Sequence, residues 1–298
     1  MRCIYCMPPE GVKKLRHDQV LKYQEMIPII EAAVSHGVFR VRITGGEPLV
    51  RKGIIDFVKS VSSIHGISDL SITTNGVFLA EFAKPLVNAG IKRVNISLDS
   101  LRPEKFQEIT RGGDIKKVFQ GINSAIEAGM NPVKINVVLI PGKNDDEIES
   151  FVRMAFEKPV QVRFIERMPF SKGEQLSGYV SQDEVRKRLV GKFNLIPTAN
   201  PDGGPASVFS LSGGGAGIIG FISPRSHPFC ASCTRLRLTS CGDLISCLDS
   251  REKINIRGFG ISLIEEKIRE LALKKGLLHK KCGFFENADH VSLSDIGG

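Results

Sequence analysis

The sequence predicts an α/β fold with a parallel sheet, and three observations support this prediction. Between residues 20 and 170, β-branched runs of strand length alternate with amphipathic segments of helix length. Several of the helical segments end at a glycine, which adopts the left-handed conformation of a helix end more easily than other residues. A helix separates each strand from the next, as parallel pairing requires.

The predicted elements follow one another in regular order. Strands are assigned where Val, Ile, Leu and Thr cluster, and helices where apolar residues recur at spacings of three and four. Gly37, Gly90 and Gly129 mark three of the helix ends. The pattern allows either a barrel or an open doubly wound sheet. In chain order the expected elements are helix 23–37, strand 39–44, helix 53–64, strand 69–74, helix 79–90, strand 92–98, helix 115–129, strand 132–139, helix 145–157 and strand 160–166.

One face of the predicted strands is polar. Alternate residues of a strand share a face, and here one face is aliphatic while the other carries charged, hydroxyl and amide groups. A packed barrel interior is filled by branched apolar side chains, so this pattern predicts a wet cavity that holds a ligand. The alternative, a solvated sheet face, is less compatible with parallel strands that helices cover. The polar residues are Arg42, Thr44, Ser71, Thr73, Asn95, Ser97, Asp99, Lys134 and Asn136.

Beyond residue 170 the alternation stops. Prolines and a glycine run at 213–215 break it, short strand-like pieces surround a second group of cysteines, and a last helix is expected near 261–275. We therefore expect two domains, the α/β sheet at 1–170 and a smaller α+β domain at 171–298.

Composition restricts the class of protein. No stretch approaches the roughly 18 apolar residues of a membrane helix, and no signal peptide is evident, so we expect a soluble intracellular protein. The formal net charge of +9 suits an anionic substrate, although an excess of Lys and Arg can equally serve to solvate the surface.

The seven cysteines lie in two tight groups that are far apart in the sequence. In a chain without an export signal, this clustering favours metal ligation over a disulfide framework. They are Cys3, Cys6, Cys230, Cys233, Cys241, Cys247 and Cys282.

Cys3 and Cys6 form a CxxC, a spacing that zinc ribbons, redox pairs and cluster sites share. Residues 45–48, after the first predicted strand, read GGEP. A CxxxCxxC loop followed by GGEP is typical of the radical S-adenosylmethionine superfamily, which the chain resembles. The resemblance implies a [4Fe–4S] cluster with one iron open to S-adenosylmethionine. The two glycines would let the backbone approach the methionine moiety of that cofactor.

The second group of cysteines begins in the run CASCTRLRLT at 230–239 and ends at Cys247. This run resembles the C-terminal site of the GTP 3',8-cyclase family, and the resemblance covers nearly the whole chain. It implies a second [4Fe–4S] cluster whose open iron meets the guanine base, while Arg235 and Arg237 bind the nucleotide. The alternative is a zinc ribbon with Cys241 as fourth ligand. The pattern favours the cluster, which leaves Cys241 and Cys282 as ordinary thiols.

The resemblance also assigns individual residues, although it names no catalytic side chain. The family's tail reaches into its active site, and the terminal Gly297 and Gly298 match it. The expected ligands are Cys3 and Cys6 for the first cluster, Cys230, Cys233 and Cys247 for the second, Tyr5, Gly46, Ser97 and Met168 for S-adenosylmethionine, and Arg42, Thr73, Lys134, Arg235 and Arg237 for GTP.

The activity that the resemblance implies is the first step of molybdenum-cofactor synthesis. GTP would become (8S)-3',8-cyclo-7,8-dihydroguanosine 5'-triphosphate after a 5'-deoxyadenosyl radical takes the 3' hydrogen of the ribose and the sugar radical attacks C8. The implied partners are an electron donor protein and the downstream cyclic pyranopterin monophosphate synthase. A homodimer is allowed, and neither a membrane nor a nucleic acid is expected. The compartment would be the cytoplasm of a prokaryote or the mitochondria of a eukaryote.

The first motif departs from the family pattern. Its first cysteine should stand four residues before Cys3, but the sequence begins at Met1. We therefore expect a partial six-stranded TIM-like barrel that lacks its first strand, and a chain that is inactive as written. Either the gene model begins at an internal methionine or the sequence is a fragment.

Two other functions remain compatible with the sequence. One is a different radical S-adenosylmethionine enzyme with an auxiliary cluster, although such enzymes usually carry more C-terminal cysteines. The other is a non-catalytic, zinc-stabilised barrel that binds nucleotide, which metal analysis would distinguish.

Overall fold

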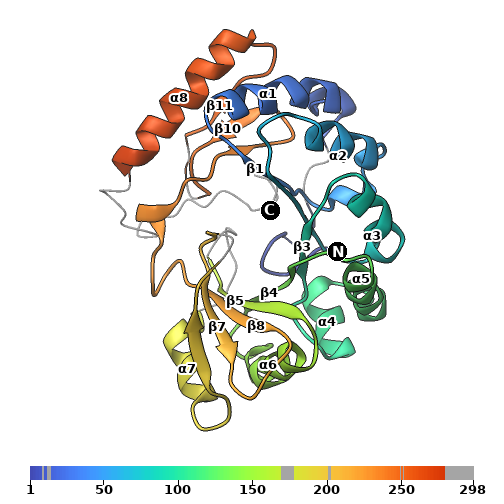
Figure 1. Ribbon diagram of the computed structural model, residues 1–298, viewed down its shortest axis with the longest axis vertical. Coiled ribbons are helices and arrows are strands. Elements are labelled where there is room, and N and C mark those ends of the chain that lie inside the picture. The colour runs from blue at the N-terminus through green and yellow to red at the C-terminus, as the bar shows by residue number, and fades with distance from the viewer. Residues whose placement is uncertain are drawn as a thin grey trace.

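The structure is a computed structural model that describes residues 1–8, 10–11, 15–168, 178–200, 203–248, 250 and 252–278. Its main feature is a curved sheet in which the described strands lie in the order β1-β2-β3-β4-β5-β8-β7-β6 (Figure 1). The strands from β1 to β8 in that order are parallel, and β7 and β6 add an antiparallel edge. The α/β class with a parallel sheet is confirmed, while a barrel that lacks its first strand stays a prediction. The strands are β1 Arg40–Ile43, β2 Asp69–Thr74, β3 Arg93–Ser97, β4 Val133–Leu139, β5 Val160–Glu166, β6 Leu195–Thr198, β7 Ser207–Leu211 and β8 Ile218–Ile222.

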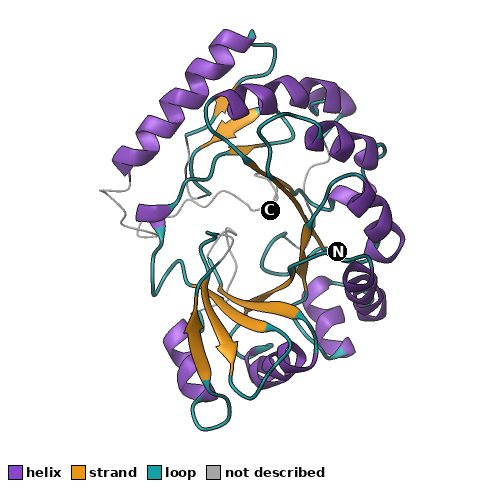
Figure 2. Cartoon of the chain, viewed as in Figure 1, coloured by secondary structure: helices purple, strands orange, loops and turns teal. Residues whose placement is uncertain are grey.

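Helices cover the outer side of the sheet, and the strands face the middle of the molecule (Figure 2). The helices expected before residue 170 are all present with small shifts at their ends. At Gly90 and Gly129, just beyond two of these helices, the backbone is left-handed, with φ of 112° and 82°. The helices are α1 Tyr23–Ser35, α2 Ile54–Ser62, α3 Leu79–Asn88, α4 Pro103–Thr110, α5 Ile115–Glu127, α6 Ile148–Glu157, α7 Gln182–Leu189 and α8 Ile261–Leu278.

Several elements were not expected from the sequence. Helix α4 begins at Pro103, and α7 begins after Ser181, whose side chain accepts a hydrogen bond from Glu184 N. Both are helix-start signals that were present in the sequence. Strand β8 lies beside β5, so the large sheet includes strands from both sides of residue 170. The domain boundary near residue 170 stays a prediction.

A second, small sheet carries the second group of cysteines. It consists of β9 Arg237–Leu238, β10 Asp243–Ile245 and β11 Ile254–Asn255, paired antiparallel in the order β11-β10-β9. A separate hydrophobic cluster joins this sheet to α8 and α1. The C-terminal region therefore extends the large sheet beyond β5 and also packs against α1 near β1. The cluster contains Leu21, Ile29, Ala32, Leu244, Ile256, Ile264, Ile268 and Leu271.

The main hydrophobic core lies between the large sheet and its helices. Ile72, Ile96 and Ile135 come from adjacent strands and are fully buried there with side chains of α2, α3 and α5. Because alternate residues of a strand face opposite sides, the residues next to Ile72, Ile96 and Ile135 in the sequence point to the side of the sheet that the helices do not cover. Among the described helices, none is long and apolar enough to cross a membrane.

Candidate functional site

The side of the large sheet that is turned away from α2, α3 and α5 is polar along β1 to β5. This confirms the alternation seen in the sequence. The structure adds polar residues that were not singled out but obey the same alternation, namely Arg40, Asp69, Arg93, Gln161 and Arg163. We call this surface the inner face, and it consists of Arg40, Arg42, Asp69, Ser71, Thr73, Arg93, Asn95, Ser97, Lys134, Asn136, Gln161 and Arg163.

Hydrogen bonds join inner-face side chains of neighbouring strands. Arg163 donates from Nη2 to Asn95 Oδ1 over 2.6 Å and from Nε to Asn136 Oδ1 over 2.9 Å. Asn95 Nδ2 donates in turn to Thr73 Oγ1 over 3.2 Å. The network runs from β2 to β5 and holds these groups in defined orientations. The inner face is therefore an organised polar lining rather than a loosely solvated surface.

An ion pair at the start of β3 completes the lining. Arg93 donates from Nε to Asp69 Oδ1 over 2.7 Å and from Nη2 to Asp69 Oδ2 over 2.5 Å. Burial raises the pKa of Asp69, but the hydrogen bonds from Arg93 and the nearby guanidinium charges outweigh it and lower that pKa. Asp69 is the only acid among the described inner-face residues, so the face is strongly basic.

Three other inner-face cations have lowered pKa values, because burial disfavours their charged forms and because they repel one another. The pKa of Lys134 falls to about 7, through burial and then the charges of Arg163, Arg93 and Arg42. The pKa of Arg163 falls to about 9 and that of Arg42 to about 10, with burial again the main cause. An anion bound here would relieve this repulsion.

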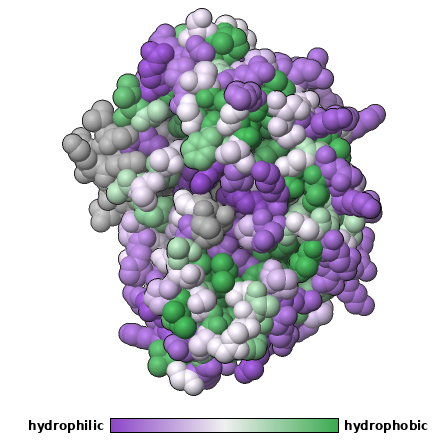
Figure 3. Space-filling model, viewed as in Figure 1, coloured by the Kyte–Doolittle hydropathy of each residue, from purple (hydrophilic) through white to green (hydrophobic). Residues whose placement is uncertain are grey.

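The region around Arg42 connects the inner face to the second group of cysteines. Arg42 is in part exposed to solvent, and the charges of Arg93, Arg235 and Arg237 add to burial in lowering its pKa. Figure 3 shows hydrophilic residues gathered across the middle of the molecule, between the helices at the top and the sheet at the bottom. The basic residues predicted to bind the nucleotide are therefore brought together from both halves of the chain.

The GGEP segment lies at the carboxyl end of β1. Glu47 accepts hydrogen bonds from Thr74 Oγ1 over 2.7 Å, from Asn75 N over 2.7 Å and from Leu49 N over 3.1 Å. These bonds tie the segment to the end of β2. No described atom lies within 4 Å of the position that a Cβ would take on Gly45 or Gly46. The backbone of both glycines is therefore open to a ligand, as the cofactor prediction requires.

The loop with Cys3 and Cys6 lies at the same end of the sheet. Cys6 N and Met7 N both donate to Cys3 O, over 3.0 and 3.1 Å, so the loop forms a tight turn. Arg111 stabilises this turn by donating a hydrogen bond from Nη1 to Met7 O over 2.6 Å. Both cysteines are half-buried. Burial, followed by the charges of Asp99 and Cys6, raises the pKa of Cys3 to about 12.

Tyr5 anchors this loop to the sheet. Its hydroxyl donates to Asp99 Oδ2 over 2.8 Å, while Val138 N donates to Asp99 Oδ1 over 2.9 Å. Burial raises the pKa of Asp99 to about 6, although the hydrogen bonds from Val138 and Tyr5 act to lower it. The two-residue link from Ser97 to Asp99 thus places the loop beside Ser97. Contacts of Tyr5, Gly46, Ser97 and the half-buried Met168 with S-adenosylmethionine stay predictions.

The second group of cysteines is arranged by the β9–β10 hairpin. Ile245 pairs with Arg237, and if the antiparallel register continued by two residues it would set Cys247 opposite Arg235, which is two residues from Cys233 in the sequence. Charges on Cys247 and Cys233 both act on Arg237, which agrees with this placement. Cys241 lies in the turn at the other end of the hairpin. This geometry disfavours the zinc alternative with Cys241 as a fourth ligand.

Cys233 is held in a positive environment. Burial raises its pKa, but a backbone hydrogen bond from Arg235 and the charges of Arg235 and Lys275 outweigh burial and bring the pKa to about 7. A thiolate, the form that binds iron, is therefore favoured. Within the described chain, no three His, Cys, Asp or Glu side chains are gathered closely enough to hold a metal ion by themselves.

Two buried charged residues brace this region. Lys275 of α8 donates to the carbonyl oxygens of Arg235 and Ser246, on the two arms of the hairpin. Glu166, at the end of β5, accepts from the backbone of Gln182, Arg225 and Ser226 and from the Ser226 hydroxyl. The chain that leads to Cys230 is thus tied to the large sheet.

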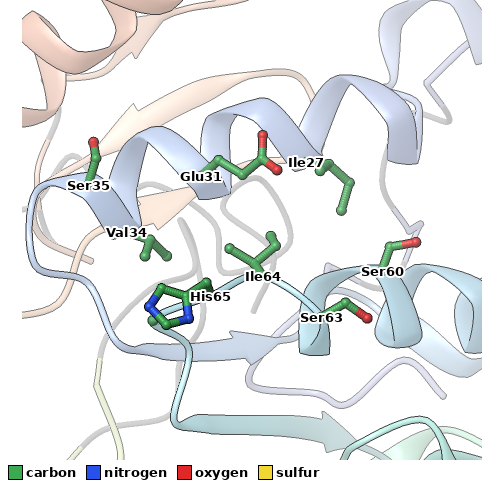
Figure 4. Close-up of a pocket in the computed structure, with 9 residues that line it drawn as sticks. Ile27, Glu31, Val34, Ser35, Ser60, Ser63, Ile64 and His65 are labelled. Carbon is green, nitrogen blue, oxygen red and sulfur yellow. The ribbon is translucent and has the colours of Figure 1, made fainter.

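A surface cavity of about 700 Å³ lies elsewhere (Figure 4). It is open to solvent between α1 and the end of α2, and Ile27, Val34 and Ile64 supply its apolar wall. Its described lining contains neither cysteine nor Lys or Arg. Its described lining thus offers no thiolate for a cluster and no Lys or Arg for a triphosphate, and the inner face is the stronger candidate.

Comparisons with known proteins agree with this geometry. The model of the Radical SAM superfamily matches residues 1–155, and that of Molybdenum Cofactor Synthesis C matches residues 160–281. The GTP 3',8-cyclase of Alkaliphilus oremlandii is 45% identical over 304 residues, 100% of this chain and 93% of that protein. That of Thermodesulfovibrio yellowstonii is 46% identical over 305 residues, 100% of this chain and 94% of that protein. This chain belongs to the GTP 3',8-cyclase family.

Solved structures show the same fold at low identity. Streptococcus suis SuiB bound to S-adenosylmethionine aligns with a TM-score of 0.58 and 14% identity, over 99% of this chain and 66% of that one. A radical SAM methyltransferase from Sphaerobacter thermophilus aligns with a TM-score of 0.50 and 16% identity, over 63% of this chain and 58% of that one. The radical SAM fold is thereby confirmed for this member of the GTP 3',8-cyclase family.

Family membership makes the chain an enzyme of the radical SAM type, for which an iron–sulfur cluster and S-adenosylmethionine are implied. The residues present fit these groups, because the Cys3–Cys6 turn, the open backbone of Gly46 and Ser97 share one end of the sheet. Cys282, Gly297 and Gly298 lie outside the described residues.

Proposed function

We propose that the chain is a GTP 3',8-cyclase, which converts GTP to (8S)-3',8-cyclo-7,8-dihydroguanosine 5'-triphosphate in the first step of molybdenum-cofactor synthesis. The basic inner face is the observation that carries the proposal. It extends from the end of the sheet that bears the Cys3–Cys6 loop to Arg235 and Arg237 of the hairpin. A triphosphate supplies the negative charge that this surface lacks.

The roles of the residues follow from their positions. Arg42, Thr73 and Lys134 would bind GTP from the inner face, and Arg235 and Arg237 from the hairpin. Arginine suits this role because its planar fork pairs with two phosphate oxygens at once. The Thr73–Asn95–Arg163 network keeps the lining rigid, so the substrate is positioned without reorganisation of the site.

The cofactor site would lie at the carboxyl end of the strands. A [4Fe–4S] cluster with S-adenosylmethionine, when bound there, would supply radical chemistry at the ribose after one-electron reduction. Tyr5, Gly46, Ser97 and Met168 would hold the cofactor. The residues of this chain would position the loop, through the Tyr5–Asp99 bond, and exclude water from the site.

The partners and the compartment belong to the same proposal. The partners would be an electron donor protein, the downstream synthase and a second copy of this chain in a homodimer. The compartment would be the cytoplasm of a prokaryote or the mitochondria of a eukaryote.

A second [4Fe–4S] cluster is proposed at Cys230, Cys233 and Cys247. The hairpin register, the lowered pKa of Cys233 and the adjacent arginines support it. Three thiolates would leave one iron free for the guanine base.

The test measures reductive cleavage of S-adenosylmethionine and the nucleotide product in anaerobically reconstituted protein. This 298-residue sequence contains two of the three cysteines of the first motif. We expect GTP-dependent formation of 5'-deoxyadenosine and of the cyclised product when all three cysteines of that motif are present, and little of either when Cys3 or Cys6 is replaced by serine. Equal rates with and without the serine substitution would mean that another ligand completes the first cluster.

Substrate choice is tested on the same protein by calorimetry. Arg235→Ala and Arg237→Ala should each weaken GTP binding roughly tenfold or more, because a charge-assisted hydrogen bond contributes about 1.5–3 kcal/mol. Cleavage of S-adenosylmethionine without any GTP binding would instead indicate a different radical SAM enzyme with an auxiliary cluster.

A further inference from the structure

Two buried polar groups of the inner face lack a hydrogen-bond partner within the described chain. They are the Ser71 hydroxyl and the Nη1 atom of Arg93. Ser71 is fully buried and Arg93 is 7% exposed. A buried donor without a partner costs about 1–3 kcal/mol, so such atoms are rare unless something else satisfies them.

The two groups are neighbours. Ser71 of β2 pairs in register with Arg93 of β3, and on its other side Ser71 pairs with Arg42 of β1. All three side chains lie on the inner face. The two unsatisfied groups therefore lie side by side on β2 and β3, and Arg42 of β1, a predicted nucleotide ligand, continues the row.

The charge around this row favours an anion over a water molecule. Asp69 already accepts from the other two nitrogens of Arg93, and no second acid lies among the described inner-face residues. A water could accept a hydrogen bond from Arg93, but it would leave the repulsion between Arg93, Arg42 and Lys134 in place. A phosphate oxygen satisfies the donors and also offsets the positive charge.

The position along the strands indicates which phosphate this would be. Arg93 precedes Ser97 by four residues on the same strand, or about 13 Å at the usual rise. Ser97 marks the end of the sheet near the Cys3–Cys6 loop, where the proposed function places the cofactor and the ribose. A phosphate at Arg93 is thus the part of the nucleotide farthest from the reacting sugar.

We propose that Ser71 and Arg93 bind the terminal phosphate of the nucleoside triphosphate, and so select a triphosphate over a monophosphate. The proposal rests on the proposed function for the identity of the nucleotide. The Arg93–Asp69 pair holds the guanidinium in place, and Nη1 and the Ser71 hydroxyl are left to donate to the phosphate.

The experiment measures binding of GTP, GMP and inorganic tripolyphosphate by calorimetry to the full chain loaded with its second cluster. Arg93→Gln should weaken GTP binding about 10- to 100-fold and GMP binding less than about twofold. Ser71→Ala should weaken GTP binding about 2- to 10-fold without lowering the melting temperature, because it removes an unsatisfied hydroxyl. Lys92→Gln is the matched control, since Lys92 is exposed and adjacent in sequence, and it should leave GTP binding unchanged.

Unchanged GTP affinity in both variants would overturn the proposal and leave water as the occupant. An equal loss for GTP and GMP would also overturn it, because Arg93 would then only support the fold. If Arg93→Gln does not fold, Ser71→Ala decides alone. If the wild-type protein binds neither GTP nor GMP, the proposed function fails. A loss of tripolyphosphate binding in the two variants but not in Lys92→Gln would still support this phosphate site.

Discussion

The inner face and the β9–β10 hairpin are both basic, but different forces hold them in place. On the inner face, Asn95, Lys134 and Arg163 are buried, and the register of parallel strands determines their neighbours. On the hairpin, Arg235 is exposed, and β9 is only two residues long. Strand register and hydrogen bonds among its own side chains therefore position the inner face, whereas the hairpin depends on side chains from elsewhere in the chain.

These side chains come from α8 and from the end of β5. Lys275 reaches the hairpin from α8, and Glu166 holds the segment before it to β5. The two regions therefore differ in how rigid they are before any ligand binds. The sheet supplies a pre-organised basic lining, whereas we expect the hairpin to gain its full rigidity only when its cluster is bound.

The largest effect is expected at the cysteines of the hairpin. Cys230→Ser or Cys233→Ser should abolish the second cluster, because two thiolates do not retain it. Iron and sulfide analysis after anaerobic reconstitution, with electron paramagnetic resonance, checks this. Cys241→Ser is the matched control and should leave iron content unchanged, since Cys241 lies at the other end of the hairpin. Loss of metal in the control, or zinc in place of iron, would contradict the cluster assignment.

A large effect on stability is expected at the connection between the two regions. Glu166→Ala leaves the buried backbone donor of Gln182 and the part-buried donors of Arg225 and Ser226 without their acceptor, so the free energy of unfolding should fall by about 3 kcal/mol. Urea denaturation measures it. Glu184→Ala removes an exposed acid nearby and should change stability by less than about 0.5 kcal/mol. Equal effects of the two variants would show that the connection contributes little.

The smallest effect concerns the charge of Lys134. Its pKa of about 7 lies below its usual value, so the unfolded chain binds more protons between about pH 7 and 10, and the free energy of unfolding of the ligand-free protein should rise with pH there. Bound phosphate favours the charged form, so GTP affinity should be highest below about pH 7 and fall by less than tenfold per pH unit above it. Calorimetry across this range checks both trends. Lys134→Met should flatten the GTP profile, and a profile that keeps its slope would assign the proton to another group.

Much of the large sheet is predictable from the sequence, because period-two alternation is a local property. Alternation alone marks Arg42, Thr73 and Lys134 as polar residues in strands whose other face is aliphatic, and Arg163 shows the same signal in its own strand. Strand β8 was not predicted to join this sheet. Its pairing with β5 depends on a contact across more than fifty residues, which no local pattern encodes.

Residue types at fixed spacings are enough to specify the α/β class, the polar face and the family. Which polar groups meet depends on the folded chain. The fold sets Arg235 and Arg237 near Arg42, keeps Cys241 away from Cys233, and leaves the unused donors of the inner face side by side. Register and packing fix the distances between residues far apart in the chain, and a buried hydrogen bond or charge contact exists only at the right distance.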